Sequence, residues 1–234
     1  MGLADLHIHT IYSYDGTALV PDILQRARNI GLDVIAITDH DEIAGALQAL
    51  EIAPDYGLEV LPGMEVTTRE GDLLAFNITE KIQPDKPLIE TVLKVRELGG
   101  FCIAPHPAAG GIGMRSLSTY SILKALRNPD VAQTLLAIET FNATIIDRTS
   151  NRYARILADR LEIARTASSD AHVLEAIGLA TTEFDGHTAQ DLLTALQKKE
   201  TRPRKQKEWT SVRILGSWAV NYVGSALTRL VTFL

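Results

Sequence analysis

The sequence has a single cysteine, Cys102, among its 234 residues, so no disulfide can form within one chain. Cys102 lies in the apolar run FCIAP, which is typical of a small buried side chain. The N-terminal segment has neither the basic stretch nor the apolar run of a secretory signal. Together these absences favour a reducing, cytoplasmic setting.

The chain also lacks an excess of basic residues. Its 23 Lys and Arg stand against 29 Asp and Glu, which gives a net charge of −6. A general nucleic-acid binder needs a basic surface, so this balance argues against that class. The sequence contains neither a Walker-type phosphate loop nor a Rossmann fingerprint.

What the sequence does contain is a regular alternation of short apolar runs and helical patterns. We expect strands near residues 5–9, 33–38, 58–66, 101–107, 134–142, 164–172 and 177–185, with 72–78 as a further strand or hairpin partner. We expect helices near 21–31, 41–57, 88–100, 117–128, 151–161 and 187–200, and a glycine-rich loop at 108–116. This alternation predicts an α/β fold with a mainly parallel sheet and six or seven β/α units.

The last residues differ in character, so we divide the chain into a domain at 1–200 and a tail at 201–234. The tail is a basic linker followed by an amphipathic helix. Its apolar stripe comprises Leu215, Trp218, Tyr222, Ala226, Leu230 and Leu234, and its polar face Ser217, Asn221, Ser225 and Thr232. Docking of the helix on the domain's own surface is favoured over an oligomer contact and over lying on a membrane surface. Arg229 and the polar face argue against a membrane-spanning helix.

Five of the six histidines occur at the ends of expected strands. These are His7, His9, His40, His106 and His172, and the carboxylates Asp5, Asp15, Glu65, Glu139 and Asp170 accompany them. The C-terminal ends of parallel strands share one face of a barrel or sheet, where active sites form. Imidazoles and carboxylates that converge there predict a polynuclear metal centre. His187 precedes a helix in a polar loop, and we expect it to be exposed and inert.

Five ordered motifs carry a resemblance to a known family. DLHIHT with the following S.DG, then AITDHD, PGMEV, PHP and SSDAH, resemble the PHP (polymerase and histidinol phosphatase) family over roughly residues 3–185. The resemblance implies a distorted (β/α)7 barrel, two or three metal ions (Mn, Fe or Zn) and hydrolysis of phosphate esters.

The resemblance also implies a set of metal ligands. One metal ion would take His7, His9, Glu65 and Asp170, a second Asp15, His40 and His172, and a third Glu65 as a bridge together with His106. Trinuclear members usually carry another histidine where this sequence has Asp72. Asp72 could bind a metal ion itself, or the third site could be weak or empty, and we lean towards a weak third site.

The expected activity is hydrolysis of a phosphomonoester or nucleotide by a metal-activated hydroxide. Asp5, Asp39 and Glu139 are candidates for orienting the ligating histidines, although a turn or cap role is slightly favoured for Asp39. Candidates for substrate binding are Arg69, Arg115, Asn142 and Arg148.

Two other functions remain open. One is a nuclease acting on oligonucleotide or DNA ends, supported by the basic residues Arg202, Arg204, Lys205, Lys207 and Arg213. The other is a regulatory PHP module without metal.

Overall fold

The sheet forms the centre of the molecule. The structure is a computed structural model that describes residues 1–110, 115–207 and 209–232, and these residues contain nine strands in one sheet. The strands are β1 (Gly2–Asp5), β2 (Val34–Ile37), β3 (Glu59–Thr67), β4 (Asp72–Phe76), β5 (Phe101–Ala104), β6 (Leu135–Asn142), β7 (Ala164–Ser168), β8 (Ala180–Phe184) and β9 (Arg202–Lys205). Their order is β7-β6-β5-β4-β3-β2-β1-β8-β9.

The sheet curls into a nearly closed barrel. Its two arms approach each other where β7 meets β8: Thr182 Oγ1 donates to the carbonyl of Ala167 at 2.9 Å, and the amide of Ala167 donates to Thr182 Oγ1 at 3.0 Å. The distorted barrel expected from the sequence is therefore confirmed.

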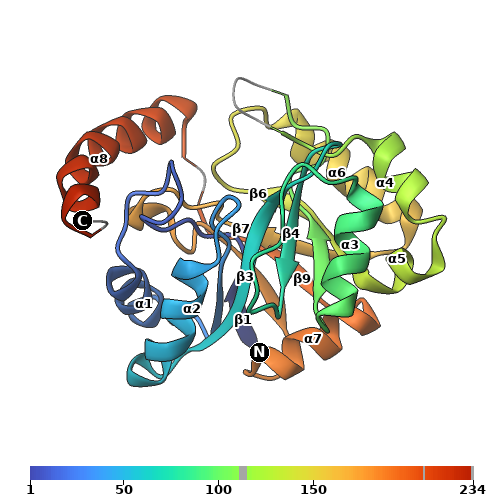
Figure 1. Cartoon of the computed structure of the whole chain (residues 1–234), viewed down its shortest axis with the longest axis horizontal. Helices are drawn as coiled ribbons and strands as arrows, with labels where there is room; N and C mark the ends of the chain where they lie inside the picture. Colours follow the sequence, from blue (N-terminus) through green and yellow to red (C-terminus); the bar gives the residue numbers. More distant parts are fainter. Residues whose placement is uncertain (111–114, 208, 233–234) are drawn as a thin grey trace.

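Helices cover the outside of the barrel (Figure 1). They are α1 (Val20–Asn29), α2 (Ala44–Ile52), α3 (Leu88–Glu97), α4 (Thr119–Ala125), α5 (Pro129–Thr134), α6 (Thr149–Leu161), α7 (Ala189–Lys198) and α8 (Ser211–Thr232), with short 3-10 turns η1 (Ala53–Tyr56) and η2 (Leu174–Ala176). Strand residues alternate between two apolar clusters, as side chains on opposite faces of a strand must. In β2, Val34 and Ala36 belong to the inner cluster, and Ile35 and Ile37 to the cluster under the helices.

The inner cluster fills the lower part of the barrel. It includes the rings of Phe76 and Phe101, whose centroids are 5.2 Å apart, and Leu192 and Leu196 of α7. Figure 1 shows α7 beneath the strands, at the end where the chain begins. Because this end is filled by apolar side chains, the opposite end, where β1 and β2 terminate, is the one left for a polar site.

The sheet is less parallel than expected. The pairs β1–β2, β2–β3, β5–β6 and β6–β7 are parallel, whereas β3–β4, β4–β5, β1–β8 and β8–β9 are antiparallel. The short turn at Thr68–Gly71 makes β3 and β4 a hairpin, one of the two alternatives for this segment. Residues 202–205, expected as part of a linker, form β9 along β8, so the sheet continues past residue 200. Gly111–Met114 of the expected loop lie outside the described residues.

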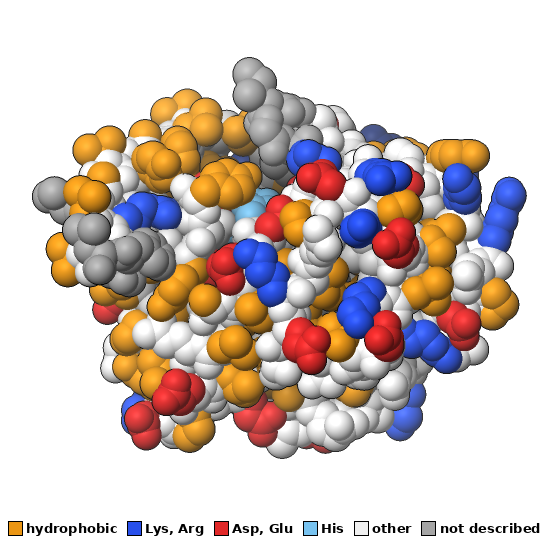
Figure 2. Space-filling model, viewed as in Figure 1, with side chains coloured by type: hydrophobic (Ala, Val, Ile, Leu, Met, Phe, Trp, Pro, Cys, Tyr) orange, Lys and Arg blue, Asp and Glu red, His pale blue; other side chains and the backbone are white. Residues whose placement is uncertain are grey.

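Helix α8 is present as expected, but a different face of it docks. Ile214, Trp218 and Arg229 are partly buried and Ser225 is buried, whereas the expected apolar stripe faces outward at Leu215, Tyr222 and Leu230. Val212, Val220, Val223 and Val231 are each more than 70% exposed, and Figure 2 shows hydrophobic side chains gathered over this helix. The helix therefore docks on the domain's own surface, and of the described members of the apolar stripe only Trp218 is partly buried. Leu234 lies outside the described residues.

Across the described residues, α8 included, we find no helix with both the length and the apolar character that a bilayer crossing requires.

Candidate metal centre

The side chains expected to bind metal ions gather at the end of the barrel opposite α7. His7 and His9 follow β1, His40 follows β2, His106 follows β5, and Asp170 and His172 follow β7. The histidines of the HxH motif do not belong to the strand itself, because β1 ends at Asp5.

Backbone hydrogen bonds hold these segments side by side beyond the regular strands. The amide of His9 donates to the carbonyl of Ala171 at 2.9 Å, and the amide of Ala171 donates to the carbonyl of His7 at 3.2 Å. His40 and Glu65 likewise form an isolated parallel bridge. Residues far apart in sequence therefore keep a fixed spacing at the mouth of the barrel.

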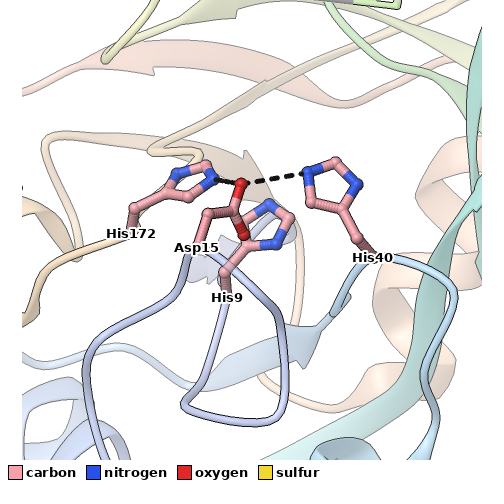
Figure 3. Close-up of side chains that lie close together, drawn as sticks. All are labelled: His9, Asp15, His40 and His172. Carbon is pink, nitrogen blue, oxygen red and sulfur yellow. Dashed lines mark hydrogen bonds and ion pairs between the residues drawn. The ribbon is translucent and has the colours of Figure 1, made fainter. Parts of the chain in front are cut away.

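Asp15 stands at the centre of the first cluster of side chains. Its Oδ2 lies 3.0 Å from His172 Nε2 and 3.4 Å from His40 Nε2, with His9 beside it (Figure 3). Each of the four residues offers a ligand atom within 4.8 Å of the other three.

Glu65 joins this cluster to a second one. Its Oε2 lies 3.0 Å from His7 Nε2 and 3.4 Å from both His9 Nε2 and His40 Nδ1, and its Oε1 lies 3.2 Å from His106 Nε2. Asp170 Oδ1 lies 3.4 Å from His7 Nε2 and 3.2 Å from His9 Nε2. The two oxygens of one carboxylate thus face different groups of imidazoles, as in a bridging ligand.

His9 tests whether these residues fit a metal ion. Its ring is buried, and neither ring nitrogen has a hydrogen-bond partner among the described residues, although Nε2 lies 3.2 Å from Asp170 Oδ1. Burial and then the neighbouring His172 lower the pKa of His9 to about 4. A buried, neutral imidazole without a hydrogen-bond partner has a lone pair available, which is the form that binds metal ions.

The spacing also fits. Two ligand atoms that each lie about 2.1 Å from one ion are roughly 3 to 3.5 Å apart, and the distances around Asp15 and Glu65 fall in that range. The mixture of imidazole and carboxylate suits Mn²⁺, Fe²⁺ or Zn²⁺.

The carboxylates of Asp15, Glu65 and Asp170 are held in their ionised form. Burial alone would raise the pKa of Asp15, but His172 and His40 outweigh this effect and hold it below its usual range. Burial alone would lower the pKa of His40, yet Glu65 and Asp15 raise it to about 10. At His172, burial alone would likewise lower the pKa, but Asp15 raises it to about 9. The cluster therefore needs positive charge, from bound protons or from a cation.

Three comparisons place the chain among known proteins. A family model described as PHP-associated matches residues 148–201. An uncharacterized protein of Methanocaldococcus jannaschii is 36% identical over 162 residues, which cover 64% of this chain and 88% of that protein. A two-domain protein of Bacteroides vulgatus, containing a predicted PHP-like metal-dependent phosphoesterase, superposes with a TM-score of 0.71 at 17% identity; the match covers 87% of this chain and 64% of that one. The chain belongs to the PHP family.

Another relative is named for an activity. A 5'-3' exoribonuclease of Haemophilus influenzae is 39% identical over 133 residues, which cover 55% of this chain and 47% of that protein.

A second layer of polar side chains surrounds the candidate ligands of this PHP domain. Glu139 Oε1 lies 3.3 Å from His7 Nδ1, and Glu139 Oε2 accepts hydrogen bonds from the His106 amide at 2.9 Å and from Asn142 Nδ2 at 3.0 Å. Asn142 Nδ2 also donates to Asp170 Oδ2 at 3.0 Å. Such contacts fix the orientation of ligating side chains. Asn142, a candidate for contacting substrate, thus lies buried behind Asp170.

Ser116 also belongs to this layer, although no sequence pattern singles it out. Its Oγ lies 3.0 Å from His106 Nδ1. It is nine residues past Pro107 along the chain, beyond the glycine-rich stretch, so neither strand periodicity nor a motif indicates the contact.

Asp5 and Asp39 make different contacts from those expected of residues that orient ligating histidines. Asp5 accepts hydrogen bonds from the amides of Ser169 and Gly178, both at 2.9 Å, and so binds backbone segments after β7. Asp39 accepts from the Thr10 amide at 2.6 Å and from Thr10 Oγ1 at 2.7 Å. It is not the cap of α2, whose N-cap residue is Ile43. Both carboxylates therefore bind backbone segments that carry candidate ligands.

Asp72 lies where a third ion could bind. One of its oxygens is within 4.8 Å of ligand atoms of both His40 and Glu65, and Thr67 Oγ1 donates to its Oδ1 at 3.2 Å. Burial and the charge of Glu65 raise the pKa of Asp72 to about 7. The hairpin β3–β4 therefore supplies a carboxylate beside the two clusters.

The three arginines considered for substrate binding differ in placement. Arg115 is half exposed and donates from Nη2 to the Thr68 carbonyl at 3.1 Å, while its own carbonyl accepts from the Asp72 amide. Arg69 donates from Nε to the Asp85 carbonyl at 3.0 Å. Arg148 donates to the carbonyl of Trp209. Of the three arginines, Arg115 is thus the one that bonds through its backbone to Asp72, the residue of β4 beside the two clusters.

Tyr14 is an additional side chain at the mouth of the site. Its ring stacks on His40, with centroids 5.0 Å apart and planes tilted by 21°, and the residue is 65% exposed. Figure 2 shows a histidine accessible from outside on this face, beside hydrophobic side chains.

His187 lies apart from the metal centre. It is exposed, and its Nδ1 lies 2.8 Å from Asp33 Oδ1.

Proposed function

We propose that this protein is a metal-dependent phosphoesterase that hydrolyses a phosphomonoester or nucleotide at a centre of two or three divalent ions. The observation that carries the proposal is the buried, neutral His9, which lies between carboxylates spaced for ion binding and has no hydrogen-bond partner in the part of the chain that the structure describes. The fold, which the chain shares with the predicted PHP-like metal-dependent phosphoesterase of Bacteroides vulgatus, supports the same reaction class.

The residues divide into roles by their contacts. His7, Glu65 and Asp170 would hold one ion, Asp15, His40 and His172 a second, and His9 lies close to both sets. Glu65 with His106 would hold a third ion, beside Asp72. Bound ions would activate a water molecule and neutralise charge on the phosphoryl oxygens.

The chain's own side chains supply the remaining functions. Glu139 and Asn142 keep His7 and Asp170 in place through the contacts described above. Arg115 is the candidate for contacting the phosphate, because its exposed guanidinium lies beside Thr68 at the start of the turn that leads to Asp72. The exposed face of Tyr14 suits the planar ring of a nucleobase or aromatic leaving group.

Turnover of p-nitrophenyl phosphate with and without Mn²⁺ tests this proposal. We expect Mn²⁺-dependent hydrolysis that a chelator abolishes, and a loss of at least about 100-fold in His172→Ala. His187→Ala is the matched control, since it removes an imidazole outside the clusters, and it should retain turnover. Metal-independent hydrolysis, or equal turnover in both variants, would contradict the proposal.

A nuclease is the second candidate, favoured by the exoribonuclease relative. The basic tail gives it little support, because Arg202 and Arg204 lie within 4 Å of Glu183, and Lys205 and Arg213 lie over aromatic rings. Hydrolysis of a 5'-phosphorylated oligonucleotide faster than of the matching mononucleotide, with binding weakened by salt, would favour the nuclease.

A metal-free regulatory module is the third candidate, and absence of bound metal after loading would favour it.

We also propose that the protein is cytoplasmic, which the single buried cysteine supports.

A further inference from the structure

The loop between β1 and α1 carries Asp15, and this loop has little regular structure of its own. Within it, the Ile11 amide donates to the Ala18 carbonyl at 2.9 Å, and the Ser13 amide to the Thr10 carbonyl at 3.1 Å. Its ends are tied to the domain: Thr10 binds Asp39, and the Thr17 amide donates to the His172 carbonyl at 3.1 Å. The part between these anchors contains Asp15.

Helix α8 binds this middle part directly. Arg229 Nη1 donates to the carbonyls of Ile11, at 2.9 Å, and Ser13, at 2.8 Å, and Nη2 donates to the carbonyl of Gly16. One planar cation therefore spans three carbonyls on both sides of Asp15. Its five N–H groups in a fixed fork suit this task, and it keeps its charge at any relevant pH.

Trp218 makes a fourth bond to the loop. Its Nε1 donates to the carbonyl of Asp15 itself at 2.9 Å. The Trp218 ring packs against the main apolar cluster, as does Ile214, and stacks on Tyr222 with centroids 4.9 Å apart. The N-terminal half of α8 is thereby fixed to the domain, so the helix can act as a rigid support for the loop.

We propose that Arg229 and Trp218 are positioning residues that hold Asp15 in the geometry needed to bind a metal ion, so that the C-terminal helix completes the metal centre. This inference rests on the proposed function. A loop of this kind would otherwise sample several conformations, and each would move the Asp15 carboxylate relative to His40 and His172. If the loop is already held in one conformation, metal binding does not have to supply the free energy of ordering it.

The test compares metal binding in Arg229→Gln, Trp218→Phe and the matched control Arg213→Gln. Arg213 belongs to the same helix, and its guanidinium lies 4.2 Å from the centroid of the Trp209 ring. Zn²⁺ affinity would be measured by competition with a chromophoric chelator, and far-UV circular dichroism would confirm that each variant is folded. We expect the Zn²⁺ affinity of one site to fall by about 10- to 100-fold in Arg229→Gln and by about tenfold or less in Trp218→Phe. The Zn²⁺ affinity of Arg213→Gln should not change.

A double-mutant cycle separates positioning from general destabilisation. In an Asp15→Asn background, Arg229→Gln should cause no further loss of Zn²⁺ affinity, because the ligand that it positions is already gone. Hydrogen exchange of residues 10–18 in the metal-free protein should be faster in Arg229→Gln than in the wild type.

Each outcome has a clear meaning. Unchanged Zn²⁺ affinity and hydrogen exchange in Arg229→Gln would overturn this inference. An equal loss of Zn²⁺ affinity on Arg229→Gln in the wild-type and Asp15→Asn backgrounds would also overturn it. In both cases the proposed metal centre would stand. Absence of Zn²⁺ binding in the wild-type protein would overturn both.

Discussion

Among single residues, Glu65 makes the most contacts with histidines of the candidate metal centre. Its two carboxylate oxygens lie within 3.4 Å of nitrogens of four histidines, namely His7, His9, His40 and His106. The sequence indicated these ligands because the ends of buried apolar runs share one face of a barrel. It could not indicate Ser116 or Tyr14, since their contacts depend on loop conformations that no periodic pattern encodes.

Glu65→Gln should reduce the metal content by at least one equivalent and lower Mn²⁺-dependent turnover at least about 100-fold, because the amide is neutral and a poor bridging ligand. Elemental analysis and steady-state kinetics would measure both. Glu59→Gln, at the exposed start of the same strand, is the control and should change neither. Full metal content in Glu65→Gln would show that the carboxylate is not a ligand.

Metal binding should release protons and strengthen with rising pH. In the metal-free protein the raised pKa values of His40, about 10, and His172, about 9, keep both imidazoles protonated at neutral pH. A ligating nitrogen must lose its proton, so each unit of pH below these values weakens binding. Titration calorimetry at pH 7 in two buffers of different ionisation enthalpy should give different apparent enthalpies, whereas equal enthalpies would contradict the prediction.

Cys102 should be dispensable for catalysis and slow to react. It is fully buried in β5, and burial raises the pKa of its thiol well above the usual range. We expect Cys102→Ala to keep its metal content and turnover and to lose about 1 kcal/mol of unfolding free energy. The native thiol should resist modification by a disulfide reagent. Loss of turnover with intact metal content would instead implicate the cysteine in the reaction.

At the scale of elements, the β3–β4 hairpin shows what determines the position of Asp72. Gly71 has φ of 142°, and a Cβ atom there would lie 2.6 Å from the backbone of Ser116 and Leu117. The turn therefore needs glycine both for its conformation and for the close approach of the segment that carries Ser116. The sequence left this segment open between strand and hairpin, because an apolar run does not define the direction of its pairing.

Gly71→Ala should destabilise the protein by about 1 to 3 kcal/mol, since it combines strain with a backbone clash. Gly57 is the matched comparison: its φ is also positive, at 65°, but an added Cβ would have no atom of the described residues within 4 Å, apart from Gly57 itself and its two chain neighbours. Gly57→Ala should therefore cost less than Gly71→Ala in urea-induced unfolding. Equal costs would mean that the clash is relieved by movement of the 115–117 segment.

At the scale of the whole molecule, helix α8 is where local pattern and observed packing diverge most. The sequence has an apolar stripe that includes Leu215, Tyr222 and Leu230, yet these side chains are exposed and the helix docks through its more polar side. The reason is not local: Arg229 and Trp218 bond to carbonyls more than 200 residues earlier in the chain. The barrel, in contrast, follows from alternating strands and helices that are nearly all visible in the sequence. An oligomer contact through the outward face of α8 stays a prediction.

Whether the histidine and carboxylate clusters bind metal ions is measured most directly by the metal content of the whole chain, purified without chelators and dialysed against excess Mn²⁺. We predict two to three equivalents per chain by elemental analysis, and at least one equivalent fewer in His172→Ala but not in His187→Ala. No bound metal after separate loading with Mn²⁺, Fe²⁺ and Zn²⁺ would contradict this prediction, and the buried histidines would then require another explanation.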